Sequence, residues 1–269
     1  MLFSIIIPTF KRPELLVQCL SCLLPQTQSY KEPYEIIVTD DSPDNDIQQI
    51  IKAQFPFVKW VEGPKKGPAS NRNYGASQAT GEWLVFTDDD CLPDKDWLQS
   101  ISAQITPGKE VDVIEGKTVA DREKRRLDEV SPINLTGGNL WSCNFAIRKS
   151  AFENLSGFDE TFKYAAGEDM DLYNRIVKNN YKVVFDEHVL VTHPWRQSKP
   201  FRNFLRSYVS YKQYILKTRN NNKWQYRKSR IKIFLHRTFT NFLSLCRFKG
   251  KGSLFYIETV VNDLLLIFI

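Results

Sequence analysis

Three consecutive aspartates are the residues in this chain best suited to chemistry. Asp88, Asp89 and Asp90 follow Thr87 at the end of the apolar run 83–86. Adjacent carboxylates repel one another, so the run gains no stability from its own charges. A divalent cation that bridges them to a phosphate would relieve this repulsion, and hard oxygen ligands suit Mg²⁺ or Mn²⁺. The alternative explanation is a solvated acidic turn or a helix cap.

The elements around the aspartates favour a shared ligand site. Runs 3–8, 35–39 and 82–87 are typical of buried strands, and apolar residues recur at helical spacing in the segments between them. This alternation predicts an α/β fold with a doubly wound parallel sheet. Ligands of such sheets bind beyond the carboxyl ends of the strands, where Thr9 and Asp40–Asp41 also stand.

The following hundred residues continue the mixed pattern. We expect strands at 111–116, 144–147, 181–185 and 189–192, and helices at 96–105, 149–154 and 167–178. The charge-dense segment 121–130 is predicted to be a mobile loop.

Six short motifs occur in a recognisable order. They are I-I-I-P-T-F, V-T-D-D-S, G-P-A-S-N-R-N-Y-G, T-D-D-D, G-F-D-E and G-E-D-M-D-L. In this order they resemble the family 2 inverting glycosyltransferases, from Phe3 to about His193. The resemblance implies a GT-A fold, which is Rossmann-like with a mixed, mostly parallel sheet flanked by helices. It also implies a metal-dependent enzyme of the hexosyltransferase type with a DXD motif.

The implied reaction moves a sugar from a UDP- or dTDP-linked donor to a hydroxyl of a glycan or lipid-linked acceptor. Cell-surface polysaccharide or glycoconjugate synthesis is the expected setting. A nucleotide-sugar-binding protein without transferase activity is the alternative from another functional class.

The resemblance also assigns roles on the donor side. The residues expected to contact the nucleotide sugar are Thr9, Arg12, Asp40, Asp41, Arg72, Asp88 and Asp89. Arg72 would pair with a phosphate as a planar fork, and Asp89 is expected to be the structural member of the acidic run. The cation, Mn²⁺ or Mg²⁺, would be held by Asp90, Asp88 and His193.

An inverting transfer needs a base that takes the proton of the acceptor hydroxyl. The resemblance assigns Asp169 as this base and Glu168 as its orienting partner. Acidic residues in a first helical turn are also favoured by the helix dipole, which is the structural alternative. The residues expected to line the acceptor pocket are Asn139, Trp141 and Asn144.

The charge distribution separates the two ends of the chain. Residues 1–199 carry 23 Lys and Arg against 29 Asp and Glu, whereas residues 200–269 carry 14 against 2. We expect a catalytic domain at 1–198 and a basic, mainly α-helical region at 199–269. Residues that are apolar except for one threonine recur there at helical spacing, at Ile231, Phe234, Leu235, Thr238, Phe242 and Leu245. A membrane-surface helix, a structural cap and a nucleic-acid patch remain open, with nucleic acid the least favoured.

The five cysteines lack metal-site spacing and are expected to be free thiols in a reducing compartment. The first residues lack the basic leader of a signal peptide. Together these features predict a cytoplasmic protein that is peripheral on the cytosolic face of the membrane if the basic region binds lipid.

Overall fold

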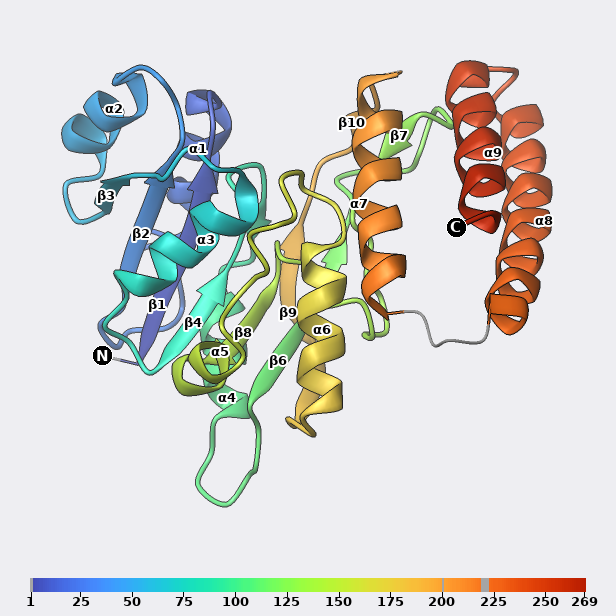
Figure 1. Cartoon of the computed structure of the whole chain (residues 1–269). Coiled ribbons are helices and arrows are strands. Elements are labelled where there is room, and N and C mark those ends of the chain that lie inside the picture. Colours follow the sequence, from blue (N-terminus) through green and yellow to red (C-terminus); the bar gives the residue numbers. More distant parts are fainter. Residues whose placement is uncertain (1, 200, 219–222) are drawn as a thin grey trace. The chain divides into compact units, whose positions relative to one another are not determined.

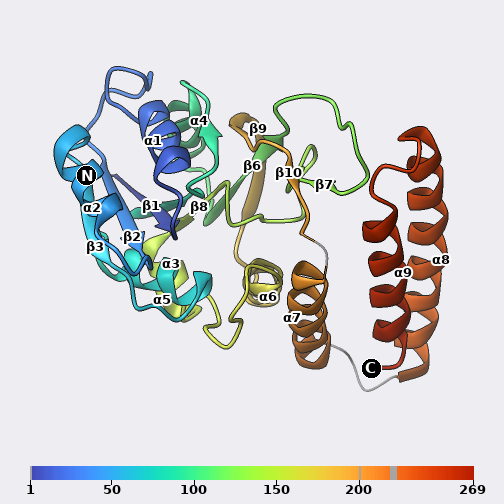
Figure 2. The same cartoon turned by 90° about the horizontal axis from the view of Figure 1, so that it is seen from above.

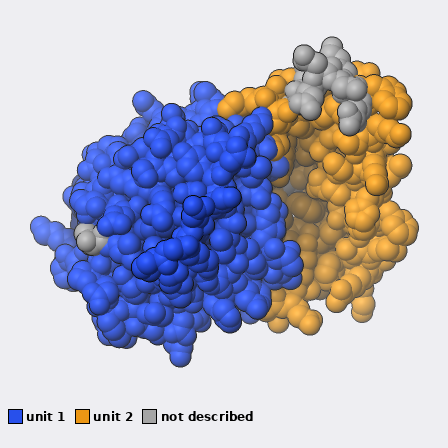
Figure 3. Space-filling model, turned by 90° about the horizontal axis from the view of Figure 1, so that it is seen from below, with its two compact units in different colours: residues 1–121, 132–194 blue, residues 122–131, 195–269 orange. Residues whose placement is uncertain are grey.

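The computed structural model describes residues 2–199, 201–218 and 223–269. It divides into two compact units, shown in different colours in Figure 3. Unit 1 contains residues 1–121 and 132–194, and unit 2 contains residues 122–131 and 195–269. The predicted boundary at residue 198 remains a prediction, and segment 122–131 groups with the C-terminal residues.

Unit 1 is built on one mixed sheet (Figure 1). Its strands are β1 (Phe3–Thr9), β2 (Glu35–Asp40), β3 (Lys59–Glu62), β4 (Trp83–Phe86), β5 (Leu92–Pro93), β6 (Val113–Val119), β8 (Phe145–Arg148) and β9 (Val183–Thr192). Their order is β3-β2-β1-β4-β8-β6-β9-β5. Strands β3, β2, β1 and β4 are parallel neighbours, and β8 is antiparallel to both β4 and β6. The sheet is therefore the mixed, mostly parallel one that the sequence predicts.

Helices cover both faces of this sheet, as the view from above shows (Figure 2). One face carries α1 (Pro13–Cys22), α2 (Asp46–Gln54) and α4 (Trp97–Gln104), and the other carries α3 (Pro68–Ser77), α5 (Lys149–Asn154) and α6 (Glu168–Lys178). Successive strand side chains point to opposite faces. Ile5 and Ile7 therefore join the first core, and Ile6 joins the second. Because both faces are buried, β1 reads as a continuous apolar run.

One strand differs from the sequence prediction. The two strands expected at 181–185 and 189–192 form a single strand, β9. Its pairing with β6 shifts between Gly116, which pairs with Asp186, and Lys117, which pairs with Leu190. Residues 187–189, of which Glu187 and His188 are polar, lie in this irregularity. A bulge absorbs extra residues without ending a strand, whereas the sequence pattern there resembles a break.

Within its described residues, unit 2 contains a two-stranded ribbon and three helices. Strands β7 (Glu129–Val130) and β10 (Arg196–Gln197) are antiparallel, and the helices are α7 (Arg202–Thr218), α8 (Lys223–Arg247) and α9 (Ser253–Ile267). The segment predicted as a loop at 121–130 thus contains a short strand, and Arg122 pairs with Glu129 at 2.7 Å. Among the described residues, no helix combines the length and apolarity needed to cross a membrane.

Candidate active site

The carboxyl ends of β1 and β4 are joined by hydrogen bonds. The Thr9 hydroxyl donates to Asp89 Oδ2 at 2.8 Å, and Arg12 Nη1 lies 3.0 Å from Asp89 Oδ1 and 2.9 Å from Asp90 Oδ2. Burial raises the pKa of Asp89 to about 6, even though Arg12 opposes this shift. Asp89 is thus held inside the site by protein groups, and the structural role predicted for it remains a prediction.

Arg72 connects the aspartate run to α6. This buried side chain of α3 places Nη2 2.7 Å from Asp88 Oδ1 and Nη1 3.2 Å from Glu168 Oε1. Burial disfavours its cation, but the two carboxylates outweigh this effect, and the pKa of Arg72 is raised. Its guanidinium also lies over the Phe158 ring, 5.7 Å from the ring centroid. A fixed positive charge therefore stands between the predicted metal side and the predicted base.

Helix α6 begins with the predicted base pair. Gly167 precedes it in the left-handed conformation, with φ of 91°, which glycine adopts without steric cost. Glu168 and Asp169 are both buried, and this burial raises the pKa of each carboxyl above its ordinary value. The amide of Met170 donates to Asp169 Oδ1 at 2.8 Å, and the Ser142 amide also stabilises the carboxylate. A carboxylate with a raised pKa is a stronger base than an ordinary aspartate.

His193 lies beside Asp90 at the end of β9. Its Nε2 is 3.3 Å from Asp90 Oδ1, and its Nδ1 is 2.9 Å from the Pro194 carbonyl oxygen. A carbonyl oxygen can only accept, so Nδ1 carries a proton and Nε2 is the ring nitrogen that faces Asp90. A carboxylate oxygen and an imidazole nitrogen in this arrangement fit a Mn²⁺ ion.

Cys91 is the third residue with a ligand atom in this group. The ligand atoms of Asp90, Cys91 and His193 all lie within 4.8 Å of one another. Burial raises the pKa of the Cys91 thiol well above its ordinary value, so the thiol stays protonated. Only a thiolate is a good metal ligand, and Asp90 and His193 therefore fit a cation better than Cys91 does.

Two aspartates at the end of β2 have different environments. Asp40 is buried, and its carboxylate accepts hydrogen bonds from the Ser42 amide at 2.8 Å and from Trp60 Nε1 at 3.3 Å. Asp41 is half-buried and accepts one from the Lys65 amide at 2.8 Å. A Cβ atom at Gly63 would overlap Asp41 Oδ1, so glycine keeps this space open. Asp41 is thus more accessible to a nucleoside than Asp40.

The predicted acceptor residues are not equivalent. Asn139 is exposed, whereas Trp141 is half-buried and donates its indole N–H to the Ile133 carbonyl at 3.2 Å. Asn144 is buried; it accepts from Trp97 Nε1 and donates to the carbonyls of Lys117 and Val189, each at 2.9 Å. Its amide is therefore engaged inside the core, and the acceptor role predicted for it remains a prediction.

Sequence reasoning missed one buried carboxylate, that of Glu115 on β6. It accepts hydrogen bonds from Asn134 Nδ2 and from the amides of Gly138 and Asn139 at 2.8 Å, and from the Leu140 amide at 2.6 Å. Glu115 thereby fixes the loop that leads to Ser142, whose amide contacts Asp169, the predicted base. The signal in the sequence was an acid directly after the apolar pair Val113–Ile114, inside a predicted strand.

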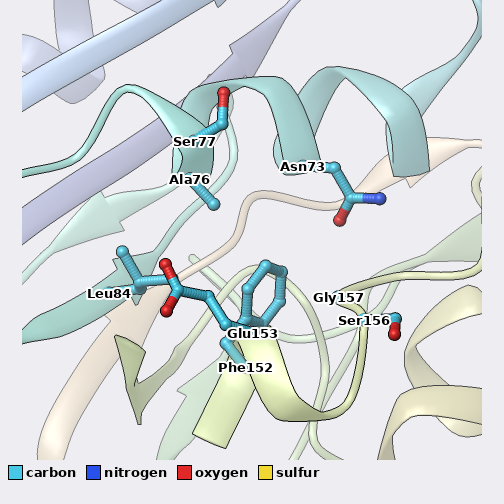
Figure 4. A pocket seen from close by; sticks show the side chains of 8 residues that line it. All are labelled: Asn73, Ala76, Ser77, Leu84, Phe152, Glu153, Ser156 and Gly157. Atoms are coloured by element: carbon cyan, nitrogen blue, oxygen red, sulfur yellow. The ribbon is translucent and has the colours of Figure 1, made fainter. Parts of the chain in front are cut away.

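A separate hollow of about 230 Å³ lies between α3 and α5 (Figure 4). Asn73, Ala76 and Ser77 line it from α3, and Phe152 and Glu153 line it from α5. None of its lining residues is a predicted site residue. The hollow is therefore distinct from the cluster of carboxylates.

The chain is similar to known proteins of one family. The model of "Glycosyl transferase family 2" matches residues 4–168. Glycosyltransferase AglE of Haloferax volcanii is 26% identical over 76% of this chain and 69% of its own length. O-antigen biosynthesis protein RfbC of Myxococcus xanthus is 28% identical over 79% of this chain, which spans only 19% of that protein.

One solved structure supports the fold. The crystal structure of GalNAc-T7 with UDP, GalNAc and Mn²⁺ has a TM-score of 0.63 and 15% identity, over 86% of this chain and 51% of that one. At this identity the likeness concerns the fold alone, which is GT-A-like. Since the family model covers more than half of the chain, this protein belongs to glycosyl transferase family 2, an inverting family of enzymes that use nucleotide sugars.

Proposed function

We propose that the protein transfers a sugar, with inversion and with a bound cation, from a UDP- or dTDP-sugar to a hydroxyl. The acceptor would be a glycan or a lipid-linked glycan used in cell-surface polysaccharide or glycoconjugate synthesis. The names of the two curated relatives, a glycosyltransferase and an O-antigen biosynthesis protein, support this setting.

The observation that carries the proposal is the bridge made by Arg72. One buried guanidinium contacts Asp88, at the end of β4, and Glu168, at the start of α6. An inverting transfer requires the leaving group and the base on opposite sides of the reacting carbon, because the acceptor attacks from the far side. Arg72 fixes the spacing between the carboxylates proposed for these two sides.

The residues on the donor side would bind and orient the nucleotide. Asp41 would accept the imide N–H of a uracil or thymine base, and Arg12 and Arg72 would face the diphosphate. Asp90 and His193, together with Asp88, would hold Mn²⁺ or Mg²⁺. The cation would act as a Lewis acid that neutralises charge developing on the leaving diphosphate.

The base would act on the acceptor. Asp169 would take the hydroxyl proton as the oxygen bonds to the sugar carbon, and the bond from that carbon to the diphosphate would break with its electron pair. Glu168 would hold the acceptor or orient Asp169. The Met170 amide keeps one oxygen of Asp169 fixed while the other takes the proton.

Two substitutions and one control test this proposal. Asp169→Asn removes the base and should lower the transfer rate by about 10²–10⁴-fold while UDP binding persists. Asp90→Ala should abolish the dependence of the rate on Mn²⁺. Asp44→Asn, at an exposed aspartate outside the site, should leave the rate unchanged.

A panel of nucleotide sugars, assayed for donor hydrolysis and for transfer to glycan acceptors, supplies the readout. Full activity in both Asp169→Asn and Asp90→Ala would contradict the roles proposed for Asp169 as base and Asp90 as cation ligand. UDP binding by calorimetry, without hydrolysis or transfer of any donor, would favour the nucleotide-sugar-binding protein without transferase activity.

A further inference from the structure

The face of α8 that points away from α9 is apolar. Arg237 Nη1 lies 2.9 Å from Asp263 Oδ1, and the Tyr226 hydroxyl donates to the Leu266 carbonyl at 2.7 Å. These contacts identify the side of α8 that packs on α9. The opposite side carries large apolar side chains that are exposed, which are Trp224, Ile231, Leu235, Phe239, Phe242 and Leu243.

This arrangement reverses the usual pattern of a surface helix. A helix that caps a core turns its apolar stripe inwards and its charges towards water. On α8 an arginine pairs inwards with Asp263, whereas Trp224 is 71% exposed and Leu235 and Phe239 are each 61% exposed. Contiguous exposed apolar surface of this kind marks an interaction site.

Basic residues accompany the apolar face. Lys228 and Lys232 are exposed and stand one turn apart on the same side, and Lys228 lies 5.2 Å from the Trp224 ring centroid. Helix α8 contains no Asp or Glu. The whole of unit 2 carries 20 Lys and Arg against 5 Asp and Glu. The partner of this face should therefore offer both an apolar layer and negative charge.

We propose that this face, from Trp224 to Leu243, lies in the interfacial layer of an anionic lipid bilayer. Leu235, Phe239 and Phe242 would enter the boundary between headgroups and acyl chains, and Lys228 and Lys232 would extend to lipid phosphates. The proposal concerns attachment of the chain and does not depend on which sugar the catalytic unit transfers.

The charges argue against two other partners. A symmetric dimer through this face would gather the basic residues of two α8 helices at one interface, with no acidic residue on α8 to pair with them. Nucleic-acid sites are polar and depend on phosphate contacts, whereas leucine, isoleucine and phenylalanine dominate this face.

Sedimentation of the full chain with vesicles tests the apolar part. The wild-type protein should bind vesicles of phosphatidylcholine and phosphatidylglycerol, and Leu235→Gln with Phe239→Gln should weaken this binding at least about tenfold. Val177→Gln, at an exposed apolar residue of α6 in unit 1, is the matched control and should bind like the wild type.

A second pair of variants tests the charges. Lys228→Gln with Lys232→Gln should weaken binding to the anionic vesicles by roughly thirtyfold, since each basic residue near an anionic surface contributes about 1 kcal/mol. Lys109→Gln with Lys178→Gln, at exposed lysines of unit 1, makes the same change of charge and should have no effect. Wild-type binding should also fall in vesicles of phosphatidylcholine alone.

Thermal stabilisation by UDP and Mn²⁺ separates this inference from the proposed function. The α8 variants should keep the same stabilisation as the wild type, because they change only unit 2. Equal vesicle binding by the wild type and the Leu235→Gln, Phe239→Gln variant would overturn the membrane inference. A dimer in solution that this variant dissociates, without vesicle binding by the wild type, would overturn it in favour of a second copy.

Discussion

At the scale of single residues, the site depends on carboxylates taken out of water. Glu168 and Asp169 are buried at the start of α6, and the positive charge of Arg72 only partly offsets the cost of ionising them. Burial of a carboxyl group raises its pKa because water no longer stabilises the anion. The pair consequently holds its protons to a higher pH than exposed carboxyl groups do.

The pH dependence of transfer should reflect this shift. Because the base acts when it is deprotonated, the rate should rise about tenfold per pH unit up to an apparent pKa above the ordinary aspartate value of about 4. The positive charge of Arg72 lowers the pKa of Asp169. Arg72→Gln should therefore move the rising limb of the pH–rate profile to higher pH, and Arg72→Lys should move it less. A limb unchanged by Arg72→Gln would contradict the assignment of Asp169.

The raised pKa values of Glu168 and Asp169 make the folded state less stable as the pH rises, whereas they make the transfer rate increase with pH. A carboxyl whose pKa is raised on folding favours the folded state while it is protonated. This contribution is fully present below the unfolded pKa and is lost as the pH rises through the folded value. Asp169, the proposed base, is therefore fully ionised only at a pH at which the folded state has lost this stabilising contribution.

At the scale of elements, hydrogen bonds from the loop 134–142 link β6 to the start of α6. Glu115 on β6 holds three amides and one side chain of this loop, and the Ser142 amide stabilises the Asp169 carboxylate. Backbone amides held by a buried acceptor cannot shift without losing hydrogen bonds. The position of Asp169, the proposed base, thus depends on a strand that carries none of the predicted catalytic residues.

Two substitutions at Glu115 should therefore differ in effect. Glu115→Ala leaves buried donors without a partner and should destabilise unit 1 by about 2–4 kcal/mol, with a fall in the transfer rate. Glu115→Gln keeps an acceptor for the three donors on Oε1 and loses only the bond from the Gly138 amide to Oε2, so its effect should be smaller. Chemical denaturation and initial rates measure both, and equal losses in the two variants would show that the carboxylate does not organise the loop.

At the scale of the whole molecule, charge divides according to the two units. Unit 1 carries 17 Lys and Arg against 26 Asp and Glu, and unit 2 carries 20 against 5. Excess negative charge in the catalytic unit opposes the binding of an anionic diphosphate. In the proposed reaction a cation, together with Arg12 and Arg72, would neutralise this repulsion when the donor binds.

Donor binding should accordingly be cooperative with the cation. UDP with Mn²⁺ at about 100 times the dissociation constant should stabilise the folded state by about 2.7 kcal/mol, and either ligand alone should stabilise it less. Thermal melts of the wild type and of Asp90→Ala measure this effect, and the variant should lose the part that requires Mn²⁺. Equal shifts with and without a chelator would argue against a metal-dependent donor site.

The amino-acid sequence by itself determined the sheet class, the helical layers and the family. Buried parallel strands read as unbroken apolar runs, and the polar residues that follow them, such as Thr9 and Asp88–Asp90, stand out at the strand ends. These signals are local, so they can be recognised in the sequence without knowledge of the fold. The mixed sheet, the family and the free state of the cysteines are confirmed.

Only the tertiary structure decided which side chains meet. The link from Asp88 through Arg72 to Glu168 joins residues up to 96 positions apart. In the sequence Glu115 resembles an interruption of a strand, and only the structure shows the loop amides that bind it. Likewise, only the contacts between α8 and α9 show which side of α8 faces outwards. Local patterns record which face of an element is apolar, but contacts between distant residues depend on how the strands are ordered and registered.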